Sequence, residues 1–280
     1  MNKLLLVDGH CLLFQMFYGM PARIIGKDGK PIQGTLGFVG AMRKILTMTQ
    51  PSHVAVIFDG ETHNPRTDLD ADYKANREDF SLVADEDNPF LQLPDIYRAL
   101  DFMGIAHTET IDCETDDVLA AYAKAYGGEC EVIICSQDSD FFQLISKNVS
   151  VLRYRGEKSV KCDVAYMRER FGIRPEQYAF FKSLTGDGSD NIKGISGIGP
   201  KTAAALVNQF NTPASLLQNA DLIKQPKLRE SVRQNAERLA LNVKLITLDG
   251  CATIPFLPEQ MLFCGQSFTT NEVLQGIGIK

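Results

Sequence analysis

The sequence has no tryptophan, only four histidines and no apolar stretch of the roughly 18–20 residues that a membrane helix needs. The short apolar run at the amino terminus ends at Asp8, so it is too brief for a signal peptide. The seven cysteines form no CxxC pair. We therefore expect no membrane partner, no zinc site and reduced thiols in a cytoplasmic protein.

The first 165 residues alternate patterns typical of strands and of helices. Such alternation predicts parallel strands joined by crossover helices, an α/β class with a mostly parallel central sheet. Residues 149–162 predict a hairpin. The expected strands are 3–7, 53–58, 105–109 and 131–135, and the expected helices are 36–49, 90–103 and 114–126.

The second part of the chain has a different character, because helical patterns dominate from about 163 to 248. We therefore predict an α/β domain over residues 1–170 and a helical domain over 171–280. The last thirty residues carry no clear pattern. Residues 62–95 stand apart as a polar insert that is far longer than the usual connection of about 2–6 residues. Such an insert is functional or mobile, and we expect mobility because few of its residues are apolar.

Nine carboxylates in five short clusters are the main chemical feature of the sequence. Several of them follow a predicted strand, and ligands of open parallel sheets bind where the carboxyl ends of the strands meet. Acids gathered there would repel one another unless hard divalent cations, which prefer oxygen ligands, neutralise them. Asp is also common in turns and helix N-caps, which would explain single clusters without a metal. The nine are Asp8, Asp59, Glu114, Asp116, Asp117, Asp138, Asp140, Asp187 and Asp190.

The charge distribution favours a nucleic-acid partner although the net charge is −6. Without the nine clustered carboxylates the rest of the chain carries +3, and residues 191–248 hold eight Lys and Arg against three Asp and Glu. An acidic pocket beside a basic surface is typical of a metal-dependent nuclease. Ordinary scatter of charge is the alternative.

The segment GISGIGPKTA predicts a glycine loop that opens a helix. Glycines at 194, 197 and 199 are followed by Pro200, a favourable first helical residue, and such a loop offers free backbone N–H groups to a phosphate. The order helix, glycine loop, helix over about 185–210 is that of a helix-hairpin-helix, which binds the DNA backbone without reading sequence. A tight turn without a ligand is the alternative.

The polar insert contains ADYKANRED, in which an aromatic residue stands beside two cations. Lys74 and Arg77 are three apart and could share a helical face, with Tyr73 alongside. An aromatic that stacks on a base and cations that meet phosphates would fit contact with a single strand. A solvated basic surface is the simpler interpretation of this segment alone.

Taken in order, the motifs LLLVDG, VIFDG, YKANR, ETDD, SQDSD, TGDGSDN and GISGIGPKTA resemble the bacterial 5′ nuclease family of flap endonucleases and 5′-3′ exonucleases. The best-known member is the N-terminal domain of DNA polymerase I. The resemblance covers about residues 3–250. It implies a PIN-like fold in a stand-alone member of the family, with a helical arch over residues 62–95 and a carboxyl-terminal helix-hairpin-helix.

The resemblance also implies the roles of the site residues. All nine carboxylates would hold two or more Mg²⁺ or Mn²⁺ ions, and a K⁺ ion would sit at the helix-hairpin-helix. Asp116, Lys74 and Arg77 would take part in catalysis. The partner would be branched or nicked duplex DNA with a 5′ flap or end, bound by a monomer. The implied DNA contacts are Arg66, Tyr73, Lys74, Arg77, Gly194, Gly197, Gly199, Lys201 and Thr202.

The sequence departs from the family pattern at two places. Gln15 stands where the family usually has an Arg, which removes a phosphate contact. The arch is acidic after Arg77, which opposes threading of a 5′ strand; the acids are Glu78, Asp79, Asp85, Glu86 and Asp87. These departures keep a second hypothesis open, a DNA-binding paralogue with weak or no nuclease activity.

We expect hydrolysis of DNA phosphodiesters by a two-metal mechanism, in which the ions hold the scissile phosphate and activate a water. We predict Asp8, Asp59, Glu114 and Asp116 around one ion, with the other five acids nearer the second. A haloacid-dehalogenase-like phosphatase that uses Asp8 is a third hypothesis. It fails because that chemistry needs DxD after the first strand, and the sequence has DGH.

Overall fold

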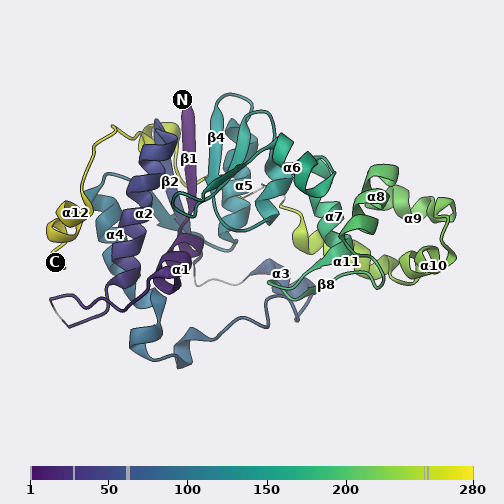
Figure 1. Cartoon of the computed structure of the whole chain (residues 1–280), viewed down its shortest axis with the longest axis horizontal. Helices are drawn as coiled ribbons and strands as arrows, with labels where there is room; N and C mark the ends of the chain where they lie inside the picture. The colour runs from purple at the N-terminus through teal and green to yellow at the C-terminus, as the bar shows by residue number, and fades with distance from the viewer. Residues whose placement is uncertain (1, 28, 61–63, 249, 251, 280) are drawn as a thin grey trace.

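The computed structural model describes residues 2–27, 29–60, 64–248, 250 and 252–279. A sheet with helices on both faces forms one end of an elongated molecule, and a smaller helical lobe forms the other (Figure 1). None of the helices in these ranges is both long and apolar enough to cross a membrane.

The central sheet has six strands in the order β3-β2-β1-β4-β5-β6. The first five pair in parallel, and β6 (Val160–Cys162) runs antiparallel to β5 (Val149–Arg153). This arrangement confirms the predicted α/β class and the hairpin. The four other strands also lie where the sequence predicts them: β1 (Lys3–Asp8), β2 (His53–Phe58), β3 (Ala106–Glu109) and β4 (Glu131–Cys135).

Both faces of the sheet are covered, because successive apolar side chains of each strand point to opposite faces. On β1, Leu5 and Val7 face one core and Leu4 and Leu6 face the other. The first core lies under α1 (Gly9–Gly19), α2 (Gln33–Thr49), α4 (Leu93–Phe102) and the C-terminal α12 (Thr270–Gly276). The second lies under α5 (Thr115–Tyr126) and α6 (Val164–Phe171).

The order of strands fixes where a ligand can bind. The chain passes from β1 to β2 and β3 on one side and then crosses to β4 and β5 on the other. The gap between the carboxyl ends of β1 and β4 is therefore a topological switch point, which is where open parallel sheets bind their ligands.

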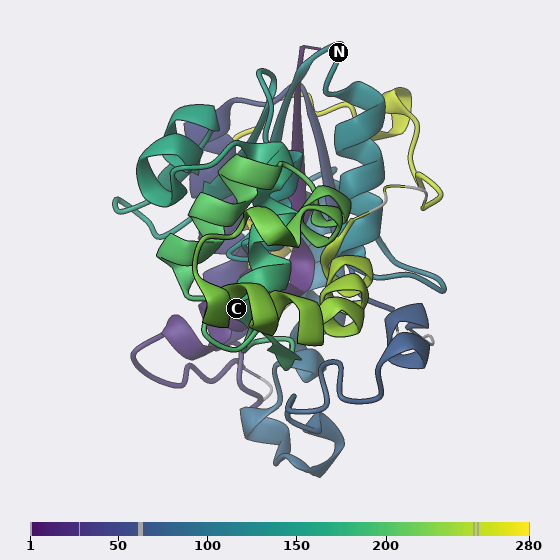
Figure 2. The same cartoon turned by 90° about the vertical axis from the view of Figure 1, so that its right-hand side faces the viewer.

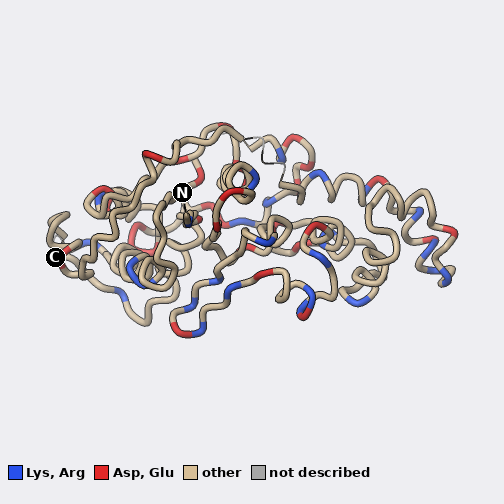
Figure 3. The backbone as a smooth tube through the Cα atoms, turned by 90° about the horizontal axis from the view of Figure 1, so that it is seen from above, with Lys and Arg blue, Asp and Glu red and all other residues tan. Residues whose placement is uncertain are grey.

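A helical lobe follows the α/β part, in line with the predicted fold class, whereas α12 near the end of the chain packs on the sheet. The lobe begins with α7 (Tyr178–Thr185), and a two-stranded ribbon, β7 (Gly186–Asp187) with β8 (Ile192–Lys193), precedes α8. In Figure 3, which colours the backbone by residue type, Lys and Arg positions recur along this lobe. Its other helices are α8 (Pro200–Phe210), α9 (Pro213–Gln218), α10 (Pro226–Gln234) and α11 (Ala236–Ile246).

The polar insert crosses the carboxyl edge of the sheet and reaches the helical lobe, as the two views in Figures 1 and 2 agree. It contains α3 (Pro65–Leu69) and three short 3₁₀ turns, η1 (Phe80–Leu82), η2 (Asp85–Asp87) and η3 (Pro89–Gln92). The first residues of the predicted arch, 62 and 63, lie outside the described residues. The insert has more anchors than the sequence analysis expected. The Tyr73 side chain is buried against the lobe, and Phe80 and Phe90 pack edge-on against Phe14.

The C-terminal segment returns from the lobe to the sheet, although its sequence carries no pattern. Phe263 donates its backbone N–H to Ser52 O at 2.9 Å, and Leu262 forms a bridge with His53. The segment then ends in α12, whose Val273 and Leu274 are fully buried. Its course depends on surfaces made by distant parts of the chain, so local periodicity does not reveal it.

Candidate metal centre

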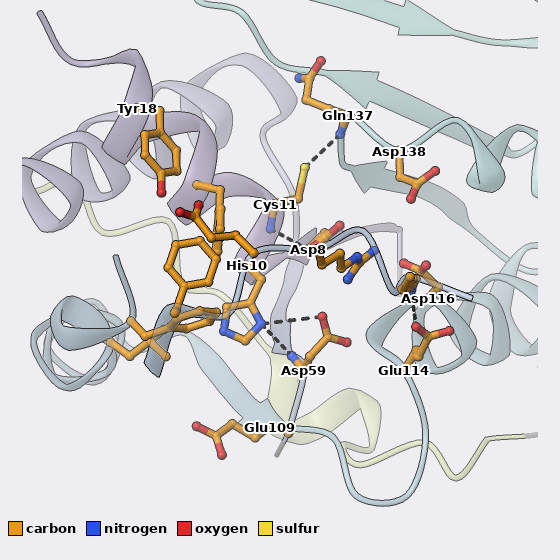
Figure 4. A pocket seen from close by; sticks show the side chains of 18 of the residues that line it. Asp8, His10, Cys11, Tyr18, Asp59, Glu109, Glu114, Asp116, Gln137 and Asp138 are labelled. Carbon is orange, nitrogen blue, oxygen red and sulfur yellow. Dashed lines mark hydrogen bonds and ion pairs between the residues drawn. The ribbon is translucent and has the colours of Figure 1, made fainter. Parts of the chain in front are cut away.

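Seven of the nine carboxylates lie at the carboxyl edge of the sheet because they follow a strand or open a helix there, and Asp187 and Asp190 come from the ribbon after α7. Asp8 ends β1 and caps α1, where its side chain accepts a hydrogen bond from the Cys11 backbone N–H at 3.0 Å. The Ser136 hydroxyl, at the end of β4, donates to the other oxygen of Asp8 at 2.8 Å. Figure 4 shows Asp59, Glu114, Asp116 and Asp138 around Asp8.

Burial and mutual repulsion raise the pKa values of the innermost acids. Burial, together with the charge of Asp59, raises the pKa of Asp8 to about 6. Asp116 is affected in the same way, since burial and the charges of Asp138 and Asp8 hold its pKa well above its ordinary value. Carboxylates that repel one another in this manner form a site that favours a divalent cation.

Asp59 is the exception among the inner acids. Burial alone would raise its pKa, but hydrogen bonds from His10 and Thr115 outweigh burial and lower it. The Thr115 backbone N–H donates to Oδ1 at 2.8 Å, and His10 Nδ1 lies 3.6 Å from Oδ2. Asp59 is therefore held ionised at the edge of the group.

The three acids at the start of α5 point in two directions, which confirms the helical periodicity expected for ETDD. Glu114 and Asp117 face Arg66 of the arch, whose guanidinium makes two bonds of 2.7 Å to Asp117. Asp116 instead faces Asp8 and Asp138. The division of the nine acids between two ions stays a prediction, but these contacts pair Asp117 with Glu114 rather than with Asp138.

A second group lies where β4 meets the helical lobe. One carboxylate oxygen from each of Asp140, Asp187 and Asp190 lies within 4.8 Å of the other two. The buried Lys182 ammonium of α7 donates to Asp140 Oδ1 and lies 2.5 Å from Asp187 Oδ2. Burial raises the pKa of Asp140 to about 7 even beside this cation, whereas the pKa of Asp187 is lowered because Lys182 and Ser189 outweigh its burial.

Sequence analysis missed Lys182, although a signal for it exists. The residue stands in FFKSL, an otherwise apolar helix that precedes the TGDGSDN motif, and a Lys is rarely buried without a partner. Burial would lower the pKa of Lys182, but Asp140, Asp138 and Asp187 outweigh burial and raise it. Lys182 therefore carries a positive charge in the second group.

Cations of the arch also meet the carboxylates. The Lys74 ammonium pairs with Glu114 Oε1, and Arg77 Nη2 lies 3.1 Å from Asp190 Oδ1. The Tyr73 hydroxyl donates to Glu114 at 3.2 Å, and its ring is buried rather than open to a base. Arg66, which was expected to contact DNA, is similarly committed to acids. In this arrangement the arch holds the acids that were predicted to hold metals.

The glycine loop before α8 has the predicted hairpin geometry. Gly194 packs so closely on Thr185 that a Cβ would lie 2.4 Å from its backbone, and Gly197 has a left-handed φ of 80°. Gly199 is the N-cap of α8, and open space surrounds the position of its missing Cβ. The exposed Lys201 and half-buried Thr202 follow in the first turn. The loop thus presents backbone groups beside a basic side chain.

A cavity of about 1510 Å³ connects the inner carboxylates with the arch. It fits divalent ions by the chemistry of its donors, since several buried carboxylate oxygens face it and repel one another. One side is lined by Asp8, Asp59, Glu114, Asp116 and Asp138, and the other by aromatic and apolar residues that include Phe14, Tyr18, Phe80 and Phe90.

Two family models match adjacent parts of this chain. The 5′-3′ exonuclease N-terminal resolvase-like domain matches residues 3–172, and the 5′-3′ exonuclease C-terminal SAM fold matches residues 173–268. Together they cover the α/β part and the helical lobe.

Curated relatives resemble the chain over most of its length. It is 37% identical over 245 residues to the thermostable DNA polymerase I of Thermus filiformis, which is 87% of this chain and 28% of that protein. It is 36% identical over 255 residues to DNA polymerase I of Rhizobium leguminosarum, which is 88% of this chain and 24% of that protein. The chain therefore spans about a quarter of the length of these polymerases.

Solved structures share the fold. The 5′-exonuclease of bacteriophage T5 with bound zinc ions matches with a TM-score of 0.73 and 22% identity, over 99% of this chain and 100% of that chain. The catalytic core of Rad2 in complex with DNA substrate matches with a TM-score of 0.57 and 13% identity, over 99% of this chain and 91% of that chain. At these identities the likeness establishes the α/β fold with its helical lobe.

Proposed function

This chain belongs to the 5′-3′ exonuclease family, and from that premise we propose that it is a divalent-metal-dependent 5′ nuclease. Its substrate is branched or nicked duplex DNA with a 5′ flap or end, and the reaction is hydrolysis of a phosphodiester bond. The convergence of the nine carboxylates at the edge of the sheet, beside a basic lobe, is the observation that carries this proposal.

The acids divide between two groups that would each hold a divalent ion, Mg²⁺ or Mn²⁺. We assign Asp138 to the first group because it neighbours Asp116, and Asp117 because Arg66 joins it to Glu114. The first group is then Asp8, Asp59, Glu114, Asp116, Asp117 and Asp138, and the second is Asp140, Asp187 and Asp190. When bound at such a site, divalent ions stabilise charge on phosphoryl oxygens and lower the pKa of a bound water. The acids would hold those ions at the topological switch point, and Asp116, which faces both Asp8 and Asp138, would be the central ligand.

The arch cations supply positive charge to the reacting phosphate. Lys74 and Arg77 are paired with Glu114 and Asp190 in this structure. Divalent ions at those acids would release both side chains toward a substrate phosphate, since each carboxylate would then have another cation. Charge-assisted bonds of this kind are roughly twice as strong as neutral ones. Tyr73, next in sequence, would turn from its buried position toward an unpaired base.

The hairpin of the helical lobe binds the duplex away from the cleavage point. Backbone groups at Gly194, Gly197 and Gly199, with Lys201 and Thr202 in the first turn of α8, would contact phosphates without reading sequence. A K⁺ ion bound through main-chain oxygens of this loop would strengthen that contact. We propose that the protein acts as a monomer in the cytoplasm.

The competing function is DNA binding with little or no cleavage. It is favoured by Gln15 and by the internal pairing of four cations with the acids: Arg66, Lys74, Arg77 and Lys182. The nine carboxylates argue against this function, because they repel one another unless they bind metal ions.

A panel of 5′-labelled substrates separates the two functions. We expect Mg²⁺-dependent release of short 5′ products from flap and nicked duplexes, and slower cleavage of blunt duplex and single strands. Chelation of the metal should abolish cleavage but leave binding. Tight binding without cleavage of any substrate in Mg²⁺ or Mn²⁺ would establish the binding paralogue instead.

A further inference from the structure

Three cationic side chains line the cavity beside the carboxylates, and one of them differs from the other two. Lys74 and Arg77 are each paired with an acid of the site. Arg153 has no carboxylate partner among the residues that the structure describes. An arginine that keeps its full positive charge at the wall of an acidic cavity is available to an anionic ligand.

Arg153 is fixed at the same edge of the sheet as the carboxylates. It is the last residue of β5, which pairs with β4, the strand that leads into Asp138. Its Nη2 donates to the Gln137 carbonyl at 3.0 Å, and its guanidinium carbon lies 5.9 Å from the centre of the Phe142 ring. These contacts hold the planar group in place, so that little side-chain freedom would be lost when it binds a ligand.

The guanidinium nevertheless has unused donors. Nη2 is committed to Gln137, whereas the Nε donor is buried and has no hydrogen-bond partner in the described part of the chain. A buried donor without a partner is costly and needs an explanation. A phosphate oxygen at the cavity wall would give the guanidinium an acceptor that the described residues do not provide.

The uncharged side chain of Gln15 lies beside Arg153. Its side-chain amide donates to the carbonyl of Tyr154, the residue after Arg153, at 2.6 Å. Arg153 is therefore the cationic side chain at this part of the cavity wall, because the neighbouring Gln15 is neutral.

We propose that Arg153 binds a phosphodiester near the one held at the carboxylates, in the same DNA strand. This inference rests on the proposed nuclease function and adds a binding residue to it. β5 lies two strands from β1, which separates Arg153 from Asp8 by about 10 Å at the strand spacing of a sheet. The two residues therefore reach different phosphates of one strand, and Arg153 fixes its register relative to the carboxylates.

The test compares removal of the arginine with removal of a single phosphate charge. Equilibrium binding of a flap substrate is measured in Ca²⁺, with one neutral methylphosphonate linkage moved stepwise around the cleavage point. We expect Arg153→Gln to weaken binding of the unmodified substrate about tenfold. The slope of the binding constant against salt concentration should fall by the equivalent of about one phosphate contact. At one linkage, not the scissile one, the methylphosphonate should abolish the difference between wild type and variant.

Two control variants isolate the charge of this side chain. Arg155→Gln removes a neighbouring exposed arginine whose Nε donates to the Gln137 side chain at 3.3 Å, and it should bind like the wild type. Arg153→Lys keeps the charge and should retain part of the affinity, and it replaces the Gln variant if that protein does not fold. Gln15→Arg should restore binding in the Arg153→Gln background more than it improves the wild type.

A purely structural Arg153 would give a different pattern. In that case Arg153→Gln would lower thermal stability, and its effect on binding would be absent or equal at every methylphosphonate position. Either result overturns the proposal while wild-type cleavage of the flap still supports the nuclease. If the wild type neither binds nor cleaves the flap in any divalent metal, the proposed function itself fails.

Discussion

Lys182 Nζ lies 2.5 Å from Asp187 Oδ2 and also pairs with Asp140, so it contacts two of the three acids of the second group. An ammonium in this place neutralises carboxylates that would otherwise repel one another. The protein can therefore fold without a metal at the second group. A divalent ion that binds there must share the acids with Lys182 or displace it.

Replacement of this lysine separates its two effects. Lys182→Met should lower the metal-free free energy of unfolding by about 3–5 kcal/mol, because a buried ion pair loses one partner. The lost stability should return as Mg²⁺ is added, and the rise in Tm with Mg²⁺ should exceed that of the wild type. Scanning calorimetry with and without Mg²⁺ measures both. Lys193→Met, on the exposed part of the nearby ribbon, is the matched control.

Removal of Asp116 should lower cleavage and raise thermal stability. Asp116→Ala should cut metal-dependent cleavage by more than about 100-fold, since it deletes the ligand that faces both Asp8 and Asp138. The same change should raise the metal-free Tm by several degrees, because repulsion among buried acids is relieved. Affinity for DNA should stay equal or rise. A lower Tm together with unchanged cleavage would show that Asp116 is structural.

Stability should depend on pH in the direction that the raised pKa values dictate. The pKa of Asp8 is raised to about 6 and that of Asp140 to about 7, so between pH 4 and 7 the folded protein binds more protons than the unfolded chain. The metal-free Tm should therefore fall as pH rises through this window. Saturating Mg²⁺ should reduce or reverse the fall. A metal-free Tm that climbs steadily from pH 4 to 7 would contradict the electrostatic description.

Much of the fold was predictable because the strands and helices of parallel α/β units have local sequence patterns. The runs HVAVIF and EVIIC predict strands whose observed bounds are the same, since strands buried on both faces are continuously apolar. The convergence of the acids was predictable too, because acids that follow parallel strands meet at the carboxyl edge of the sheet. The C-terminal segment was not predictable, because its position depends on Ser52 and on helices far away in sequence.

The cations were harder to predict than the acids. Arg66 was expected to contact DNA, yet its guanidinium makes two hydrogen bonds to Asp117. The two residues are 51 positions apart, so only the folded arch brings them together. Arg153 follows a strand at the same edge as Asp138, and the reasoning that selected the acids would have selected it too. Lys182 required knowledge that an apolar helix face packs against the site.

The arch lysine should act on the reacting phosphate more than on the duplex. Lys74→Ala should lower turnover of a flap substrate at least tenfold more than it lowers affinity, because its partner in the reaction is the phosphate near the carboxylates. Single-turnover cleavage and equilibrium binding in Ca²⁺ give the two numbers. Lys201→Ala, in the hairpin, should show the opposite balance. Equal losses of rate and affinity in Lys74→Ala would mark that lysine as a general electrostatic contact.

The most direct test of this account is to locate Mn²⁺ by anomalous diffraction in crystals soaked with the ion. The account predicts peaks at the carboxyl edge of the sheet, one among Asp8, Asp116 and Asp138 and a second near Asp140, Asp187 and Asp190, with Lys182 moved aside. Loss of the first peak in Asp116→Ala would complete the result. Crystals that hold no Mn²⁺ at these acids at millimolar concentration, or hold it only elsewhere, would contradict the central claim that the carboxylates form a metal centre.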